Sequence, residues 1–74
     1  MLESGRLTMK IIIHTKYGTF ESKEQENTDE VYDKLKEFLS NIPNYKYISI
    51  ETEKGFIYMT STMINESLFS LEKN

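Results

Sequence analysis

Cysteine is absent from this 74-residue sequence, which excludes disulfide bonds, thiolate zinc sites and a cysteine nucleophile. Only one histidine is present, His14, so a histidine-rich metal site is excluded as well. The longest aliphatic run is the isoleucine triplet at residues 11–13, far too short to cross a bilayer. No cationic start followed by a long apolar stretch is visible, and we expect a cytoplasmic protein without a signal peptide.

Basic residues are also fewer than acidic ones. Nine Lys and Arg residues against twelve Asp and Glu residues give a net charge of -3. A general nucleic-acid-binding protein normally carries a basic surface, so this balance argues against that class. Hydrophobic residues make up 38% and charged residues 28%, a composition typical of a small folded domain rather than of a disordered chain.

Residues 1–8, MLESGRLT, differ from the rest because they show no hydrophobic period and contain a Ser-Gly break. Gly5 and Arg6 can be encoded by a purine run just upstream of the Met9 codon, where a bacterial ribosome-binding site would lie. We therefore expect residues 1–8 to be a translated leader, the alternative being a disordered N-terminus. Residues 9–74 are expected to form one small α+β domain.

The first part of that domain reads as a β-hairpin over residues 9–23. Met9, Ile11 and Ile13 share one face of a strand, whereas Ile12 lies on the other face between Lys10 and His14. A turn is expected at residues 16–18, where a glycine tolerates positive φ, and a short return strand at residues 19–22.

A helix is predicted over residues 28–41 by an apolar stripe with a period of 3.6 residues. The stripe consists of Val31, Leu35, Phe38, Leu39 and Ile42. Asn27 is a candidate N-cap, with Glu30 reaching back to it, and Thr28 is the rival cap. Pro43 closes the segment because the residue before a proline is driven out of helical geometry.

The C-terminal half reads as a second hairpin, with strands at residues 45–52 and 56–62 and a turn at residues 53–55. One helical turn, capped by Ser61 or Thr62, is expected over residues 61–66. A last short strand is expected at residues 68–71. The predicted class is α+β, with a single helix packed on a four- to five-stranded, mainly antiparallel sheet in the order β-β-α-β-β-β.

One helix covers only one face of such a sheet. The aliphatic face is the better match to the helix stripe, and its members are Ile11, Ile13, Ile48, Ile50, Ile57 and Met59. The opposite face is expected to carry Ile12, Tyr45, Tyr47, Phe56 and Tyr58. Such a large aromatic patch indicates contact with a partner, so the candidate interface or ligand residues are Tyr45, Tyr47, Phe56 and Tyr58. Two rival arrangements remain: the helix covers the aromatics, or residues 63–71 fold back over them.

The segment KGFIYM at residues 54–59 matches part of the RNA-recognition-motif strand signature, which begins basic-Gly-aromatic. Ile57 replaces the small residue of that signature, and Ser61 falls where its last aromatic belongs. A single-stranded nucleic-acid binder is therefore a weaker alternative, and nucleic acid is not the expected partner.

Catalytic chemistry finds little support in the sequence. His14 is a lone histidine on a strand, and no Ser-His-Asp set is visible. Glu51 and Glu53 would share a strand face, where a metal or acid–base pair is conceivable, but a solvated hairpin end is the better explanation. We expect a non-enzymatic protein with no catalytic residue, no metal and no cofactor.

The segment IIIHTKYGTF at residues 11–20, with GFIY at 55–58 and MINESL at 63–68, resembles small uncharacterised proteins of phages and prophages of low-GC bacteria. The wealth of Lys, Ile, Asn and Tyr, whose codons are AT-rich, agrees with a low-GC source. The resemblance implies an origin but no activity. The leading hypothesis is a homo-oligomer that binds a host or viral protein. The alternative is an oligomer that holds a nucleotide-like metabolite in a pocket lined by Tyr and Lys between subunits.

Overall fold

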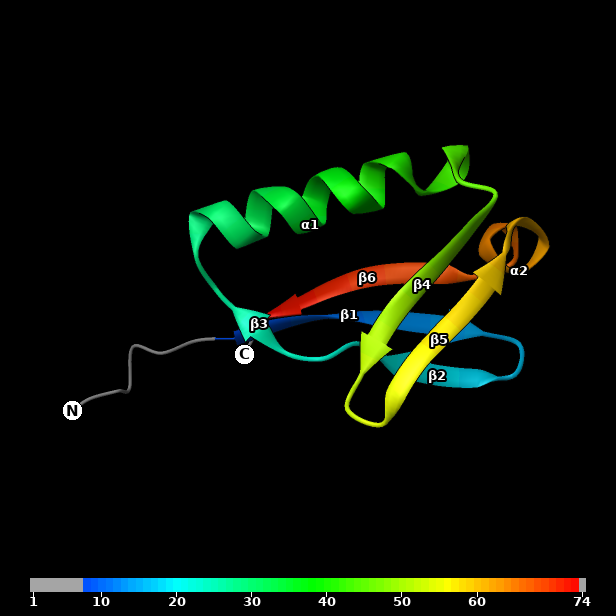
Figure 1. Cartoon of the computed structure of the whole chain (residues 1–74), viewed down its shortest axis with the longest axis horizontal. Coiled ribbons are helices and arrows are strands. Elements are labelled where there is room, and N and C mark those ends of the chain that lie inside the picture. Colours follow the sequence, from blue (N-terminus) through cyan, green and yellow to red (C-terminus); the bar gives the residue numbers. More distant parts are fainter. Residues whose placement is uncertain (1–7, 74) are drawn as a thin grey trace.

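The computed structural model describes residues 8–73, an α+β arrangement in which one main helix packs against antiparallel strands (Figure 1). The elements in chain order are β1 (Thr8–Thr15), β2 (Gly18–Glu21), β3 (Gln25–Glu26), α1 (Asp29–Asn41), the 3-10 helix η2 (Ile42–Asn44), β4 (Tyr47–Thr52), β5 (Gly55–Thr60), α2 (Ser61–Asn65) and β6 (Leu68–Lys73). The predicted leader lies outside the described residues, except for Thr8, which begins β1.

β1 is the centre of a four-stranded antiparallel sheet. Met9 lies opposite both Gln25 of β3 and Lys73 of β6, so these two strands flank β1 on opposite sides. β2 continues the β3 side, with Phe20 opposite Ile13. The α+β class, with one main helix on antiparallel strands, is as predicted. The single predicted sheet is divided in two: the four-stranded sheet includes β3, which was not predicted, and β4 and β5 form a two-stranded sheet of their own.

The two hairpins turn in the same way. Thr15 Oγ1 accepts a hydrogen bond from the Tyr17 N–H at 3.0 Å and donates to the Gly18 carbonyl at 2.9 Å. Thr52 Oγ1 makes the equivalent pair with the Lys54 N–H, at 3.2 Å, and the Gly55 carbonyl, at 3.1 Å. Gly18 and Gly55 have positive φ, +137° and +145°. Residues with a side chain are strained in this conformation. Both turns lie where the sequence predicts them.

The N-cap of helix α1 is Thr28, the rival candidate, and not Asn27. Thr28 is in extended conformation and its hydroxyl accepts a hydrogen bond from the Val31 N–H at 3.2 Å. Asp29 and Glu30 occupy the first turn, where the helix dipole favours negative charge. Leu35, Phe38 and Leu39 of the predicted stripe lie partly buried against the core, while Ile42 is buried in η2.

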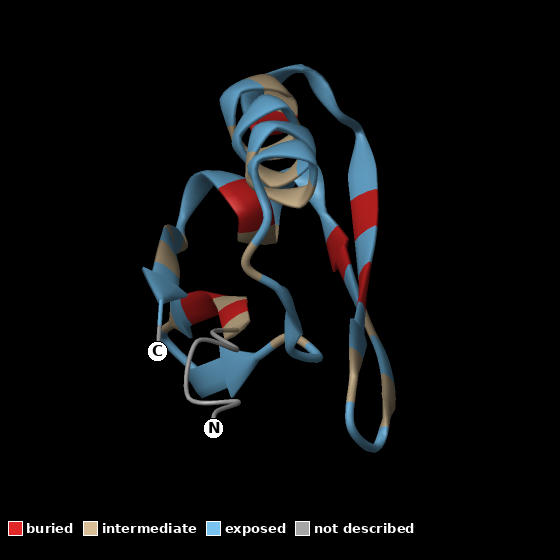
Figure 2. Ribbon diagram, turned by 90° about the vertical axis from the view of Figure 1, so that its left-hand side faces the viewer, coloured by how far each residue is buried: buried red, intermediate tan, exposed pale blue. Residues whose placement is uncertain are grey.

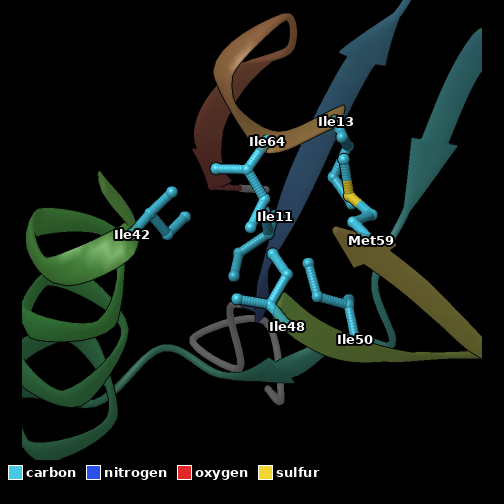
Figure 3. Packing of buried hydrophobic residues seen from close by; sticks show 7 residues of the cluster. All are labelled: Ile11, Ile13, Ile42, Ile48, Ile50, Met59 and Ile64. Atoms are coloured by element: carbon cyan, nitrogen blue, oxygen red, sulfur yellow. The ribbon is translucent and has the colours of Figure 1, made fainter. Parts of the chain in front are cut away.

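The core lies between the two sheets, with helical segments closing one side (Figure 2). Figure 3 shows its side chains converging from five elements: Ile11 and Ile13 (β1), Ile42 (η2), Ile48 and Ile50 (β4), Met59 (β5) and Ile64 (α2). The predicted aliphatic face is therefore the core face, although Ile57 is only partly buried.

Ile12 corrects the prediction. It is only 7% exposed, whereas the sequence placed it on the exposed aromatic face. Two facts explain the difference. Ile12 lies on the central strand with Glu21 on one side and Ser70 on the other, so neighbouring strands cover it. The aromatic residues belong to the other sheet, and Ile12 never shared a surface with them.

The C-terminal elements differ from expectation only at their ends. Helix α2 has Thr60 at its N-cap position, without a side-chain hydrogen bond, in place of the predicted Ser61 or Thr62. β6 extends beyond the predicted residues 68–71 to Lys73 and pairs with β1 along its whole length. Within residues 8–73, no helix is long and apolar enough to cross a membrane.

Candidate functional site

The outer face of the β4–β5 hairpin carries three exposed aromatic rings. Tyr47 is 71%, Phe56 58% and Tyr58 74% exposed. On the same strands Ile48 and Met59, which lie directly opposite each other, point into the core. Since side chains alternate between the two faces of a strand, the core contacts of the aliphatic residues force the aromatics outward.

The three rings form one patch, here called the aromatic face and defined as Tyr47, Phe56 and Tyr58. Phe56 and Tyr58 stack with ring centroids 6.3 Å apart and an interplanar angle of 28°. Tyr58 lies opposite Ser49, two residues from Tyr47, so these two tyrosines are diagonal neighbours across the hairpin. Long aromatic side chains reach each other over that spacing, and the aromatic face is continuous.

Tyr45, the fourth candidate, lies elsewhere. It follows η2 and precedes a bend at Lys46, so it is outside β4 and outside the alternation that fixes Tyr47. Its ring stacks on Phe38 of α1 at a centroid distance of 5.8 Å. The structure thus brings three of the four predicted residues together and uses Tyr45 to attach the main helix.

The carboxylate of Glu51 borders the aromatic face, and it has a partner. Glu51 lies opposite Phe56 in the hairpin. Its Oε2 is 3.6 Å from Lys23 Nζ, and its backbone carbonyl accepts a hydrogen bond from the Lys23 N–H at 2.8 Å. Lys23 belongs to the segment between β2 and β3, so this contact also ties the two sheets together. The charge of Glu51 is offset where it borders the rings.

A groove of about 410 Å³ lies between β2 and the β4–β5 turn, and none of its lining residues belongs to the aromatic face. We call it the β2 groove; its walls include Thr19, Phe20, Glu21, Glu24, Lys54 and Ile57. Sequence reasoning missed it because no local pattern shows that β2 and the distant β4–β5 turn lie close together. Lys10 also lines it and donates a hydrogen bond to Glu21 Oε1 at 2.8 Å, which raises the pKa of the Lys10 ammonium above its ordinary value.

The β2 groove differs from the Tyr- and Lys-lined pocket that the alternative hypothesis, an oligomer holding a nucleotide-like metabolite, requires. Lys10 and Lys54 line it, but no tyrosine is among its described lining residues. Glu21, Glu24 and Glu53 line it as well, an unfavourable setting for a phosphate. The intersubunit Tyr–Lys pocket stays a prediction about an assembly, distinct from this groove.

The residues considered for catalysis are spread apart. His14 is exposed in β1, opposite Thr19 and Leu68. Glu53 lies in the turn beyond the end of β4 and lines the β2 groove, so it does not share a strand face with Glu51. In the described part of the chain, no group of three or more His, Cys, Asp or Glu residues is placed to hold a metal ion.

Comparisons of the chain with protein-family models, with curated proteins and with solved structures find no match.

Proposed function

We propose that this chain is a small non-enzymatic binding protein that forms a two-fold dimer through its aromatic face. The observation that carries the proposal is the outward presentation of Tyr47, Phe56 and Tyr58 on one rigid hairpin whose other face is core. Aromatic rings with a polar edge are the side chains that interfaces favour most, because each buries a large area at little cost in conformational freedom.

The area of the aromatic face fits a dimer interface. A buried aromatic side chain covers about 150–250 Å², so three rings exposed to the extent seen here offer roughly 300–500 Å². A stable interface needs about 800 Å² on each partner. The rings supply about half, and the adjoining outward residues Ser49 and Thr60 extend the same surface. The patch is also as large as the largest apolar patch that a typical monomer exposes.

The charge of the aromatic face favours a second copy over a highly charged partner. A two-fold interface places the same residues of both copies near one another, so an unpaired charge there would repel itself. Glu51 is paired with Lys23, and the aromatic face itself contains no Asp, Glu, Lys or Arg. Two copies of this face can therefore meet without repulsion between unpaired charges of the same sign.

The resemblance to small phage and prophage proteins supports a setting in which the dimer then binds a host or viral protein. A dimer presents every remaining surface twice, which strengthens binding to a repeated or symmetric partner. The proposal is a cytoplasmic adaptor of this kind, in the host cytoplasm where the gene is carried by a phage.

Sedimentation equilibrium tests the self-association. The parent is expected to dimerise, and Tyr58→Glu or Tyr47→Glu is expected to be a folded monomer, because the new carboxylates would face each other across the axis. Tyr17→Glu is the matched control, since Tyr17 is equally exposed at 70% but lies in the other hairpin turn. A parent that stays monomeric at high micromolar concentration contradicts the proposal. Equal association of all folded variants places the interface elsewhere.

A further inference from the structure

We propose that the β2 groove binds an extended peptide segment of a partner protein, which adds to the sheet as a strand beside β2. The segment would alternate aliphatic residues with Lys or Arg. This inference is independent of the dimer, because the β2 groove and the aromatic face share no residue.

The outer edge of β2 has backbone groups to offer. The Ser22 N–H donates to the Ile11 carbonyl at 2.9 Å, which makes these two residues a hydrogen-bonded pair of the antiparallel ladder. Such pairs alternate along a ladder, so Phe20 also points its backbone groups toward β1. Thr19 and Glu21 must then point their N–H and C=O groups away from β1, toward the groove that they line.

That edge carries no strand within residues 8–73. β2 pairs with β1 alone, and the Lys23 N–H, just past the end of β2, is taken by Glu51. Unpaired edges of this kind are templates for strand addition. Here the β4–β5 turn forms an opposite wall, so the edge lines a groove of about 410 Å³. That volume is within the usual range of ligand sites.

The walls of the groove define the side chains of the segment. On the core side of β2, Phe20 is 37% exposed and Ile57 is only partly buried, so both offer apolar contact. On the other side lies Glu21, which faces Lys10. Residues of an added strand alternate between these two sides. One set would therefore be aliphatic, against Phe20 and Ile57, and the other set would lie beside Glu21.

The charge of the groove selects a basic segment. Three carboxylates, Glu21, Glu24 and Glu53, line it together with two ammonium groups, Lys10 and Lys54. One of these ammonium groups, that of Lys10, is already bonded to Glu21 at 2.8 Å. Lysine or arginine on the outward positions of the segment would balance the excess carboxylate, whereas glutamate there would add to it.

The test is an NMR titration of the ¹⁵N-labelled full chain with a short capped peptide of alternating Lys and Val. We expect saturable shifts confined to the amides of residues 18–24 and 52–54 and of Ile57, and much weaker binding of the alternating Glu and Val peptide. Absence of saturation at millimolar peptide overturns the proposal. Shifts centred on Tyr47, Phe56 and Tyr58 overturn it too, since the peptide would then occupy the aromatic face.

Two pairs of variants test the mode of binding. Thr19→Pro removes the outward N–H and should weaken binding at least about fivefold, whereas Thr19→Ala keeps that N–H and should bind as the parent does. Glu24→Lys should weaken binding about two- to fivefold, and Glu37→Lys, which makes the same charge change on the exposed helix, should not. Equal peptide affinity of the two variants within both pairs overturns the proposal. If Thr19→Pro does not fold, the comparison of Glu24→Lys with Glu37→Lys decides whether the peptide binds in the groove.

Discussion

Lys23 joins the two sheets through two contacts with Glu51: a backbone hydrogen bond of 2.8 Å and an ion pair of 3.6 Å. The first contact positions β4 beside the segment that connects β2 to β3. The second offsets a carboxylate that borders the aromatic face. One residue outside any strand therefore affects both the assembly of the core and the charge of the proposed interface.

Removal of the Lys23 ammonium should weaken the dimer more than the fold. In Lys23→Ala the backbone bond remains, and loss of an exposed ion pair should change the free energy of unfolding by about 0.5 kcal/mol or less. Two unpaired Glu51 carboxylates would then meet near the axis, and the dimer dissociation constant should rise severalfold. Urea unfolding and sedimentation equilibrium measure the two effects. Lys34→Ala, which breaks the Lys34–Glu30 pair on α1, should alter neither.

Truncation of Ile13 should cost a large part of the domain's total free energy of unfolding. Ile13 has no exposed surface and lies in the middle of the core cluster, so Ile13→Ala should cost about 2–5 kcal/mol. A domain this small has only about 5 kcal/mol in total. Leu68→Ala is the control, because Leu68 is mostly exposed on the neighbouring strand and should cost little. Similar urea midpoints for the two variants would place the core elsewhere.

The cap of α1 offers a second test of stability. Thr28→Ala should cost about 1 kcal/mol, since it removes the oxygen that accepts from the Val31 N–H. Asn27→Ala should leave thermal unfolding almost unchanged, because the hydroxyl of Thr28 is the one bonded to the helix. A larger loss for Asn27→Ala would mean that the helix begins one residue earlier in solution.

Gly55 allows a test of backbone strain without steric contact. A Cβ at this position would meet no atom within 4 Å, so any cost of substitution comes from its φ of +145°. Gly55→Ala should destabilise the chain by about 1–2 kcal/mol. D-alanine introduced there by chemical synthesis adopts positive φ readily and should be neutral or stabilising. If both enantiomers destabilise equally, the turn has another conformation.

The sequence predicted what depends on local periodicity. The period of two in the second hairpin correctly separated Ile48, Ile50 and Met59 from Tyr47, Phe56 and Tyr58, because their alternation is a property of the strand itself. The stripe of α1 and the two glycine turns were predictable for the same reason. Each of these signals is complete within one short segment.

What the sequence did not show depends on contacts between distant segments. β3 has only two polar residues, Gln25 and Glu26, and exists because they pair with the start of β1. Ile12 is covered by strands on both sides, including β6 from the other end of the chain. The β2 groove forms where the Lys23–Glu51 contact holds the two sheets together, which no local pattern reveals.

Contact between the aromatic faces of two copies can be observed with an isotope-filtered NOE experiment. Protein labelled with ¹³C is mixed with unlabelled protein at a concentration where sedimentation shows association. Intermolecular NOEs are expected between the ring protons of Tyr47, Phe56 and Tyr58 of one copy and the same rings of the other. A populated dimer whose intermolecular NOEs come from α1 or from β6, with none from these rings, would contradict it.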